Sequence, residues 1–125
     1  MLKGYCGKIM RVNLTRRTTS VEPLKENEVR SLLGGRGIAA KYYYDEIAPT
    51  VDALAPENKL FFLTGPLTGT PLVSTTKFQV ATKSPETRMY LCSNCGGDFG
   101  PQLKQAGFDG LIKIGRASCR ERVSY

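Results

Sequence analysis

The stretch KLFFLTGPLTGTP (residues 59–71) combines a continuous apolar run with a loop rich in glycine and proline. Leu60 to Leu63 contain no polar residue, which is typical of a strand buried in the middle of a sheet. Gly65, Pro66 and Gly69 follow at once and predict a tight connection whose backbone can approach a ligand closely. The stretch therefore predicts a β-sheet with a glycine loop after a central strand.

The segments on either side predict further strands. Met10, Val12 and Leu14 alternate with polar residues, which indicates a half-buried strand, and a second strand over 19–22 completes a hairpin. Additional strands are expected at Lys77 to Thr82, at Met89 to Cys92, and from Leu111 to residue 113.

Helices are predicted from Glu26 to a glycine stop at Gly34, from Ile38 to Glu46, and around Phe99 to Ala106, where apolar residues recur at helical spacing. Hairpins are as common as crossovers in this pattern, so we predict a sheet-rich α+β fold. The length of 125 residues fits one domain.

Composition excludes several kinds of site. The chain has no His, which excludes His-dependent triads and mixed His/Cys zinc sites within it. Cys6, Cys92 and Cys95 are interpreted as reduced thiols of a cytoplasmic protein. No apolar run approaches the roughly 20 residues of a membrane span, so no membrane partner is expected.

The last twelve residues, 114–125, do not look like part of the natural protein. IGRASCRERV, from Ile114 onward, matches the translation of a common sequencing adapter residue for residue. We therefore expect residues 1–113 to be native, a partial N-terminal domain, and residues 114–125 to be a foreign tail. The tail carries three Arg and one Glu, so the native part is two units less positive than the net charge of +7.

Glycine loops, a lysine and a cysteine pair are the candidate chemical features. The loops span 34–37, 65–70 and 94–100, and backbone N–H groups in such loops favour anions, although turns and helix caps use the same residues. Lys77, before a strand, could face an anion or only solvent. The C-x-x-C pair Cys92 and Cys95 could be a redox dithiol or half of a metal site, or could merely line a loop.

Five segments in this order resemble the N-terminal domain of the tungsten-containing aldehyde ferredoxin oxidoreductases. They are GYCGKIMRVNLT, LLGGRGIAAK, APENKLFFLTGPLTGTP, ATKSPET and SNCGGDFGPQLKQAGFDG. The resemblance extends from Gly4 to about Leu111 and is specific as a set. It implies a β-sheet domain of that type, incomplete at its C-terminal end, that forms a base for the cofactor.

By this resemblance, the parent enzyme oxidises aldehydes to carboxylic acids and passes electrons to ferredoxin. Its cofactors are a tungsten (or molybdenum) bis-pterin, a magnesium ion bridging the pterin phosphates, and a [4Fe-4S] cluster. Asn94 matches a magnesium-binding position, Gly96 a backbone contact to the pterin, and Lys77 a pterin contact where the family often has Arg. Lys keeps the charge but loses the planar donor fork.

The resemblance places the cluster ligands and catalytic groups in later domains, so the chain is expected to be inactive alone. Leu60 to Leu63 and Met89 to Cys92 are expected to pair with or pack on those missing segments, which would favour aggregation of the isolated chain; a homo-oligomer is possible for the parent. The alternatives are a separate module that binds an anion or nucleotide through Arg36 and Lys77, and a C-x-x-C redox or metal module. Nucleic acid is not expected as a partner, because aromatic residues do not alternate with a basic stripe.

Overall fold

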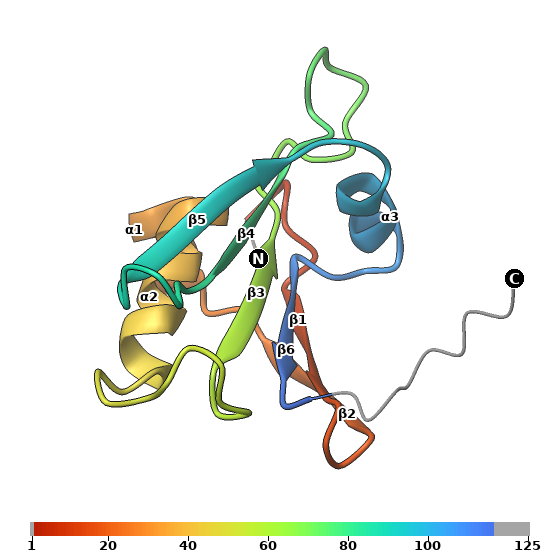
Figure 1. The fold of residues 1–125 in the computed structure, drawn as a ribbon. Helices are drawn as coiled ribbons and strands as arrows, with labels where there is room; N and C mark the ends of the chain where they lie inside the picture. Colours follow the sequence, from red (N-terminus) through yellow and green to blue (C-terminus); the bar gives the residue numbers. More distant parts are fainter. Residues whose placement is uncertain (1, 117–125) are drawn as a thin grey trace, which may run out of the picture.

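The computed structural model describes residues 2–116, which form one mixed sheet with three helices (Figure 1). The α+β prediction is confirmed. In chain order the elements are β1 (Lys8–Asn13), β2 (Thr18–Pro23), α1 (Glu26–Leu32), α2 (Gly35–Glu46), β3 (Lys59–Leu63), β4 (Phe78–Lys83), β5 (Tyr90–Cys95), α3 (Phe99–Gln105) and β6 (Gly110–Ile114).

The strands follow the order β2-β1-β6-β3-β4-β5 across the sheet. β1 and β6 are parallel, and every other neighbouring pair is antiparallel. Phe61 lies opposite Ile112 of β6 on one side and Ala81 of β4 on the other, so the apolar run does form a central strand. The expectation that Leu60 to Leu63 pair with segments encoded after the junction is wrong. β3 is already paired on both sides, with β4 and with β6.

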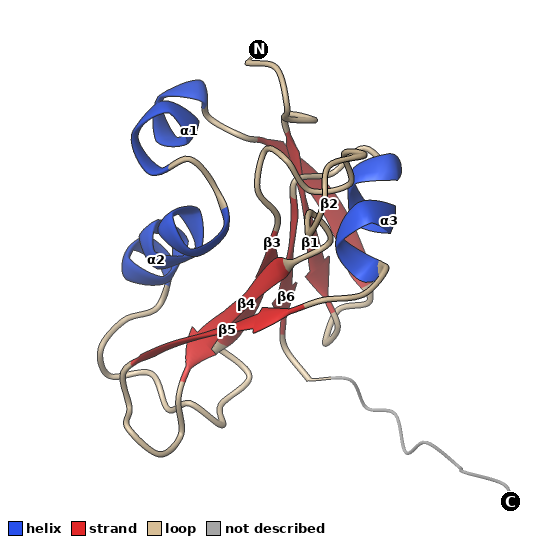
Figure 2. Cartoon of the chain, turned by 90° about the horizontal axis from the view of Figure 1, so that it is seen from above, coloured by secondary structure: helices blue, strands red, loops and turns tan. Residues whose placement is uncertain are grey.

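Helices α1 and α2 cover one face of the sheet, and α3 lies against the other (Figure 2). The face beneath α2 holds the core. Ile9, Phe61, Ala81 and Ile112 are fully buried there, because alternate residues of a strand point to the same face. Ile38 and Ala39 of α2 belong to the same buried cluster.

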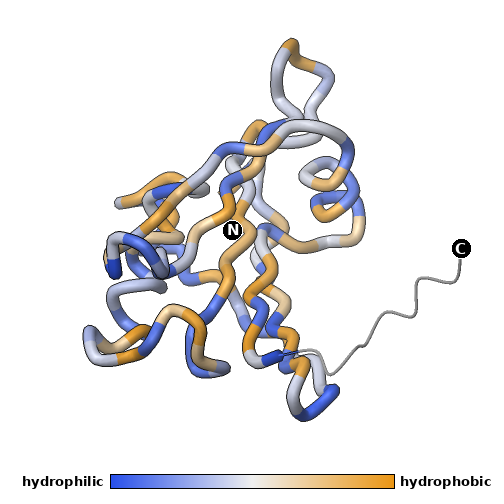
Figure 3. The backbone as a smooth tube through the Cα atoms, viewed as in Figure 1, coloured by the Kyte–Doolittle hydropathy of each residue, from blue (hydrophilic) through white to orange (hydrophobic). Residues whose placement is uncertain are grey.

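The second face is covered only in part. Phe99 anchors α3 there, with its ring centroid 4.8 Å from that of Phe78 and 5.7 Å from that of Phe62. Val21 on β2 and Leu91 on β5 stay 56% and 47% exposed on the two edge strands. The loop before β4 also carries an exposed apolar tip at Leu72 and Val73, which projects from the fold (Figure 3).

Most element boundaries agree with the sequence predictions to within one or two residues, and the differences at α2, β5 and β6 bear on the site or on the predicted junction. α2 begins at Gly35 instead of Ile38, and β5 continues through Cys95 instead of ending at Cys92. β6 includes Ile114, one residue past the predicted junction, and pairs with β1 and β3 there. The rest of the predicted foreign tail, beyond residue 116, lies outside the described residues.

A half-buried ion network fastens the end of α2 to the sheet. Glu46 accepts hydrogen bonds from Arg11 of β1 and, at 2.6 Å, from Lys59 of β3. Arg11 also donates to Glu22 of β2 at 2.6 Å. Burial alone would raise the pKa of the Glu46 carboxyl, but the hydrogen bonds from Arg11 and Lys59 together hold that pKa below its ordinary value.

Candidate functional site

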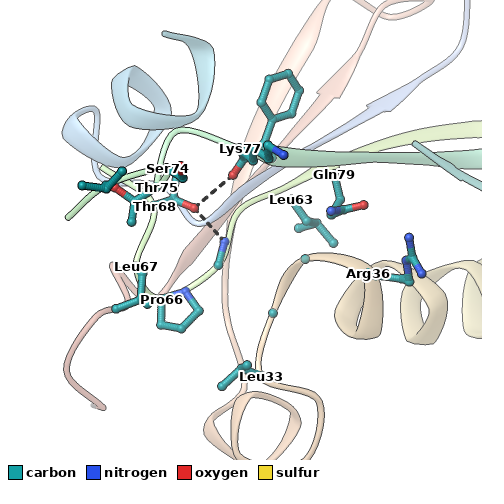
Figure 4. Close-up of a pocket in the computed structure, with 15 residues that line it drawn as sticks. Leu33, Arg36, Leu63, Pro66, Leu67, Thr68, Ser74, Thr75, Lys77 and Gln79 are labelled. Carbon is teal, nitrogen blue, oxygen red and sulfur yellow. Dashed lines mark hydrogen bonds between the residues drawn. The ribbon is translucent and has the colours of Figure 1, made fainter. Parts of the chain in front are cut away.

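A pocket of about 470 Å³ lies between the first residues of α2 and the first residues of β4. Its walls come from three segments that the sequence separates: residues 33–36, residues 63–68 and residues 73–79 (Figure 4). Leu63 and Pro66 give it an apolar floor, while Arg36, Lys77 and Gln79 supply polar groups. Two of the three glycine loops seen in the sequence therefore meet at one place.

Close backbone contact draws the start of α2 onto the end of β3. The N–H of Gly35 donates to the carbonyl of Thr64 at 3.0 Å. A Cβ at Gly34 would stand 3.0 Å from the same oxygen and 3.2 Å from the Cα of Gly65, so only glycine lets these two segments approach this far. The 34–37 loop is thus a wall of the pocket as well as a helix start.

Thr68 holds the third wall in place. Its buried hydroxyl accepts a hydrogen bond from the N–H of Gly65 at 3.1 Å and donates to the carbonyl of Lys77 at 3.3 Å (Figure 4). The hydroxyl thereby closes the long loop between β3 and β4 across its base. Lys77 is consequently fixed at the rim of the pocket through its backbone.

The charge of the pocket has one sign. Arg36 and Lys77 are its charged lining residues, and no Asp or Glu of residues 2–116 lines it. Within the described part of the chain, neither cation forms an ion pair with a carboxylate. Two unpaired cations beside an apolar floor have the chemistry that suits an organic anion.

Gln79 links the pocket to β5. Its side-chain amide donates to the Oδ1 of Asn94, and its Oε1 accepts a hydrogen bond from the Cys92 thiol at 3.0 Å. All three side chains lie on the α2 face, since Gln79 is opposite Asn94 in the antiparallel register. Gln79 was not predicted from the sequence, where its position two residues after Lys77 in a strand was the one available signal.

The three residues singled out from the sequence lie at one end of the β4–β5 hairpin. Lys77 lines the pocket, whereas Asn94 is one hydrogen bond away from it, through Gln79. Continuing the register one step past Phe78 and Cys95 puts Lys77 opposite Gly96. A Cβ at Gly96 would meet nothing within 4 Å, so its backbone is open to a ligand.

The C-x-x-C pair lies in strand β5, not in a loop. Residues three apart in a strand point to opposite faces, which separates the Cys92 and Cys95 thiols. Across residues 2–116, no group of three or more Cys, Asp or Glu side chains is arranged to hold a metal ion. The strand geometry argues against both the dithiol and the metal-site alternatives.

Tyr90, beside the site, has a perturbed pKa. It donates its hydroxyl to the carbonyl of Arg36 at 3.3 Å, and burial, followed by the interaction with Cys92, raises the pKa of its phenol. The phenol is therefore neutral near pH 7 and adds no negative charge next to Arg36.

No helix among residues 2–116 has the length and apolar character needed to cross a membrane.

The family is established by comparison with known proteins. The sequence profile of the family described as "Aldehyde ferredoxin oxidoreductase, N-terminal domain" matches residues 9–123, and the chain belongs to that family. The predicted resemblance is confirmed. The relatives are oxidoreductases, so the fold described above is the N-terminal domain of an oxidoreductase family.

Several relatives illustrate the range of the family. The chain is 46% identical to a tungsten-containing aldehyde ferredoxin oxidoreductase of Pyrococcus abyssi, over 91% of this chain and 19% of the relative. It is 37% identical to the "Aliphatic sulfonate oxidoreductase, WOR-like subunit" of Pyrococcus furiosus, over 91% of this chain and 18% of that protein. The chain thus spans about a fifth of the length of these relatives.

A solved structure agrees with the fold. The chain superposes on the active-site complex BamBC of benzoyl coenzyme A reductase, in complex with 1,5-dienoyl-CoA, with a TM-score of 0.90 and 34% identity. The match covers 94% of this chain and 18% of that one. The same domain therefore occurs in oxidoreductases whose names specify different substrates.

Proposed function

We propose that this chain is the cofactor base of an enzyme that oxidises aldehydes to carboxylic acids with ferredoxin as electron acceptor. The cofactor would be a tungsten (or molybdenum) bis-pterin. The observation that carries the proposal is the cationic pocket, lined by no carboxylate of residues 2–116, next to the open Gly96 backbone in a chain of this family. The aldehyde is proposed because the tungsten-containing aldehyde ferredoxin oxidoreductases are 40% to 46% identical to the chain.

The residues present fit a flat ring system that carries a phosphate. Leu63 and Pro66 offer apolar surface for the ring, and Lys77 offers a cation for the anionic group. The open space at Gly96 lets the edge of a ring reach the backbone N–H and C=O groups of the turn after β5. We assign Lys77 and Gly96 to pterin binding.

Asn94 would supply an oxygen ligand to magnesium between the pterin phosphates. Its Oδ1 accepts one hydrogen bond from Gln79, which fixes the orientation of the amide. A carbonyl oxygen has two lone pairs, so one remains for the ion. Magnesium prefers oxygen ligands and keeps several waters, so a single amide oxygen with phosphates suits it.

The bound metal and its pterins would supply the two-electron chemistry, and the protein supplies binding and orientation. Among residues 2–116, Cys92 and Cys95 point to opposite faces and do not form a cluster site. We therefore assign the [4Fe-4S] cluster, the aldehyde pocket and the ferredoxin contact to the four fifths of the relatives that this chain does not span.

The test uses the 125-residue chain and a fluorescent probe, 6-hydroxymethylpterin phosphate, followed by fluorescence anisotropy with and without Mg²⁺. Lys77→Gln should weaken binding about tenfold, since it removes one charge-assisted contact. Lys25→Gln serves as the matched control, because Lys25 is an exposed lysine directly before α1 and does not line the pocket. Asn94→Ala should abolish the gain in affinity from Mg²⁺. Absence of probe binding by the folded wild-type chain would refute the proposal.

A further inference from the structure

Arg36 is a cation with no carboxylate partner among residues 2–116. It is the second residue of α2, it is exposed, and its side chain lines the same pocket as Lys77. Some cations of the described chain are paired, as Arg30 is with Glu26 at 2.8 Å, and others, such as Arg16, are unpaired but lie outside the pocket. The Arg36 guanidinium instead faces a cavity lined by no carboxylate of residues 2–116.

The backbone beneath Arg36 is held from two sides. The preceding Gly35 donates its N–H to the Thr64 carbonyl of the β3 end at 3.0 Å. The carbonyl of Arg36 itself accepts the hydroxyl of Tyr90, whose ring packs edge-on against Tyr43 with centroids 5.1 Å apart. The guanidinium therefore extends from a fixed point between β3 and β5, which lowers the entropic cost of ordering it on a ligand.

Arg36 and Lys77 approach the pocket from different walls. Arg36 comes from the start of α2, and Lys77 directly precedes β4. Gln79, the second residue of β4, lines the pocket beside them (Figure 4). Guanidinium offers a planar fork of donors that matches two oxygens of one phosphate, whereas ammonium acts as a point charge. The positive end of the α2 dipole adds to the same field.

We propose that Arg36 binds the phosphate of the pterin ligand, as the partner of Lys77. The inference rests on the proposed function and specifies which atoms meet the anion. A phosphate monoester carries about −1.5 to −2 charges at pH 7, which two cations without a competing carboxylate can balance. The apolar floor at Leu63 and Pro66 would hold the ring beside it.

The experiment compares two fluorescent ligands on the 125-residue chain: 6-hydroxymethylpterin phosphate and 6-hydroxymethylpterin, which lacks the phosphate. Arg36→Gln should weaken binding of the phosphate ester about tenfold or more and leave the dephosphorylated ligand unchanged. Arg36→Lys should fall between the two, because it keeps the charge and loses the fork. Arg16→Gln in the β1–β2 turn is an exposed arginine outside the pocket and should have no effect.

The outcomes separate the inference from the proposed function. Equal weakening of both ligands, or none, in Arg36→Gln with an unchanged melting temperature overturns the role of Arg36 while pterin binding stands. Failure of wild type to bind either ligand refutes the proposed function and the inference with it. Inorganic phosphate as competitor tests the source of the anion: displacement only at concentrations far above those of the ester supports a pterin phosphate, and displacement at equal concentrations overturns it.

Discussion

The carboxylate of Asp109 accepts a hydrogen bond from the backbone N–H of Gly7 at 2.6 Å, across 102 residues of chain. The same carboxylate accepts from the N–H of Cys6 at 3.0 Å and from the ammonium of Lys104 at 2.7 Å. The backbone N–H of Asp109 donates to the carbonyl of Lys8 at 2.8 Å. These bonds bring the entries of β1 and β6 together and so set up their parallel pairing.

Asp109→Asn is expected to destabilise the chain by about 3 kcal/mol. Asp109 is 3% exposed, so the substitution leaves the Lys104 ammonium, itself 9% exposed, without its counter-charge. It also turns an N–H₂ group toward backbone donors. Urea unfolding followed by circular dichroism measures the change.

Asp98→Asn provides the control, because Asp98 precedes α3, is exposed and makes no side-chain capping bond. We expect it to change the free energy of unfolding by less than about 0.5 kcal/mol. Equal stability of the Asp109 and Asp98 variants would show that the buried carboxylate does not hold the two strand entries together.

The stability of the chain should fall in acid through Glu46. Its folded-state pKa lies below the ordinary value of 4.5, so the unfolded chain binds a proton here more readily than the folded one. The stabilisation is therefore complete above pH 4.5 and is lost as pH falls through the folded value. Urea unfolding at a series of pH values from 7 to 3 measures this slope.

Glu46→Gln should remove that part of the slope and cost about 2 kcal/mol at pH 7, since Arg11 and Lys59 lose a shared partner. Asp45→Asn is the neighbouring control, whose exposed pair with Lys41 contributes little. An unchanged acid slope in Glu46→Gln would assign the loss of stability to other carboxyl groups.

Local patterns were enough to predict most elements of the fold. Alternation at Met10 to Leu14 and the apolar run at Leu60 to Leu63 each correspond to a strand. The end of β5 was missed because Ser93, Asn94 and Cys95 are small or polar and have weak strand preference, while pairing with β4 extends the strand through them. The place of β6 was missed because its partners are distant in sequence, and periodicity does not report pairing.

The site was predictable only in its parts. Glycine loops and Lys77 are visible in the sequence, but the pocket exists because Gly34 lets α2 approach the end of β3. The role of Gln79 depends on its register opposite Asn94, which no local pattern encodes. Ion pairing likewise depends on the tertiary structure, so only the structure shows that Arg36 lacks a carboxylate partner among residues 2–116.

Two glycines of the third loop should respond differently to Ala. A Cβ at Gly100 would stand 2.9 Å from the carbonyl oxygen of Thr76 and 3.1 Å from the methyl group of Thr68, so Gly100→Ala must push α3 away from the loop. We expect a loss of about 1–3 kcal/mol despite the better helix propensity of Ala. Thermal unfolding measures it.

Gly96→Ala is the matched variant, since its Cβ would enter open space. Its stability should stay within about 0.5 kcal/mol of wild type. Pterin phosphate binding should nevertheless fall several-fold, because the methyl group occupies the space through which the ring reaches the backbone. A stable Gly96→Ala chain that binds the probe like wild type would remove Gly96 from the site.

The isolated chain should self-associate through its incompletely covered sheet. β5 is an edge strand with one side unpaired, and Leu91 is 47% exposed on the face that α3 leaves open. Exposed edges with apolar side chains template pairing with other chains, and a lysine on such an edge blocks it. Leu91→Lys should therefore lower the aggregated fraction several-fold in size-exclusion chromatography with light scattering.

A change in net charge alone could have the same effect, so Leu54→Lys serves as the control. Leu54 is 65% exposed in the loop before β3, outside the strands of the sheet. The Leu54→Lys substitution adds the same charge without changing the β5 edge, and we expect it to leave aggregation nearly unchanged. If both substitutions solubilise the chain equally, repulsion between charged molecules is the cause and the β5 edge is not; if neither does, the association uses another surface, and the exposed Leu72 and Val73 tip becomes the next segment to substitute.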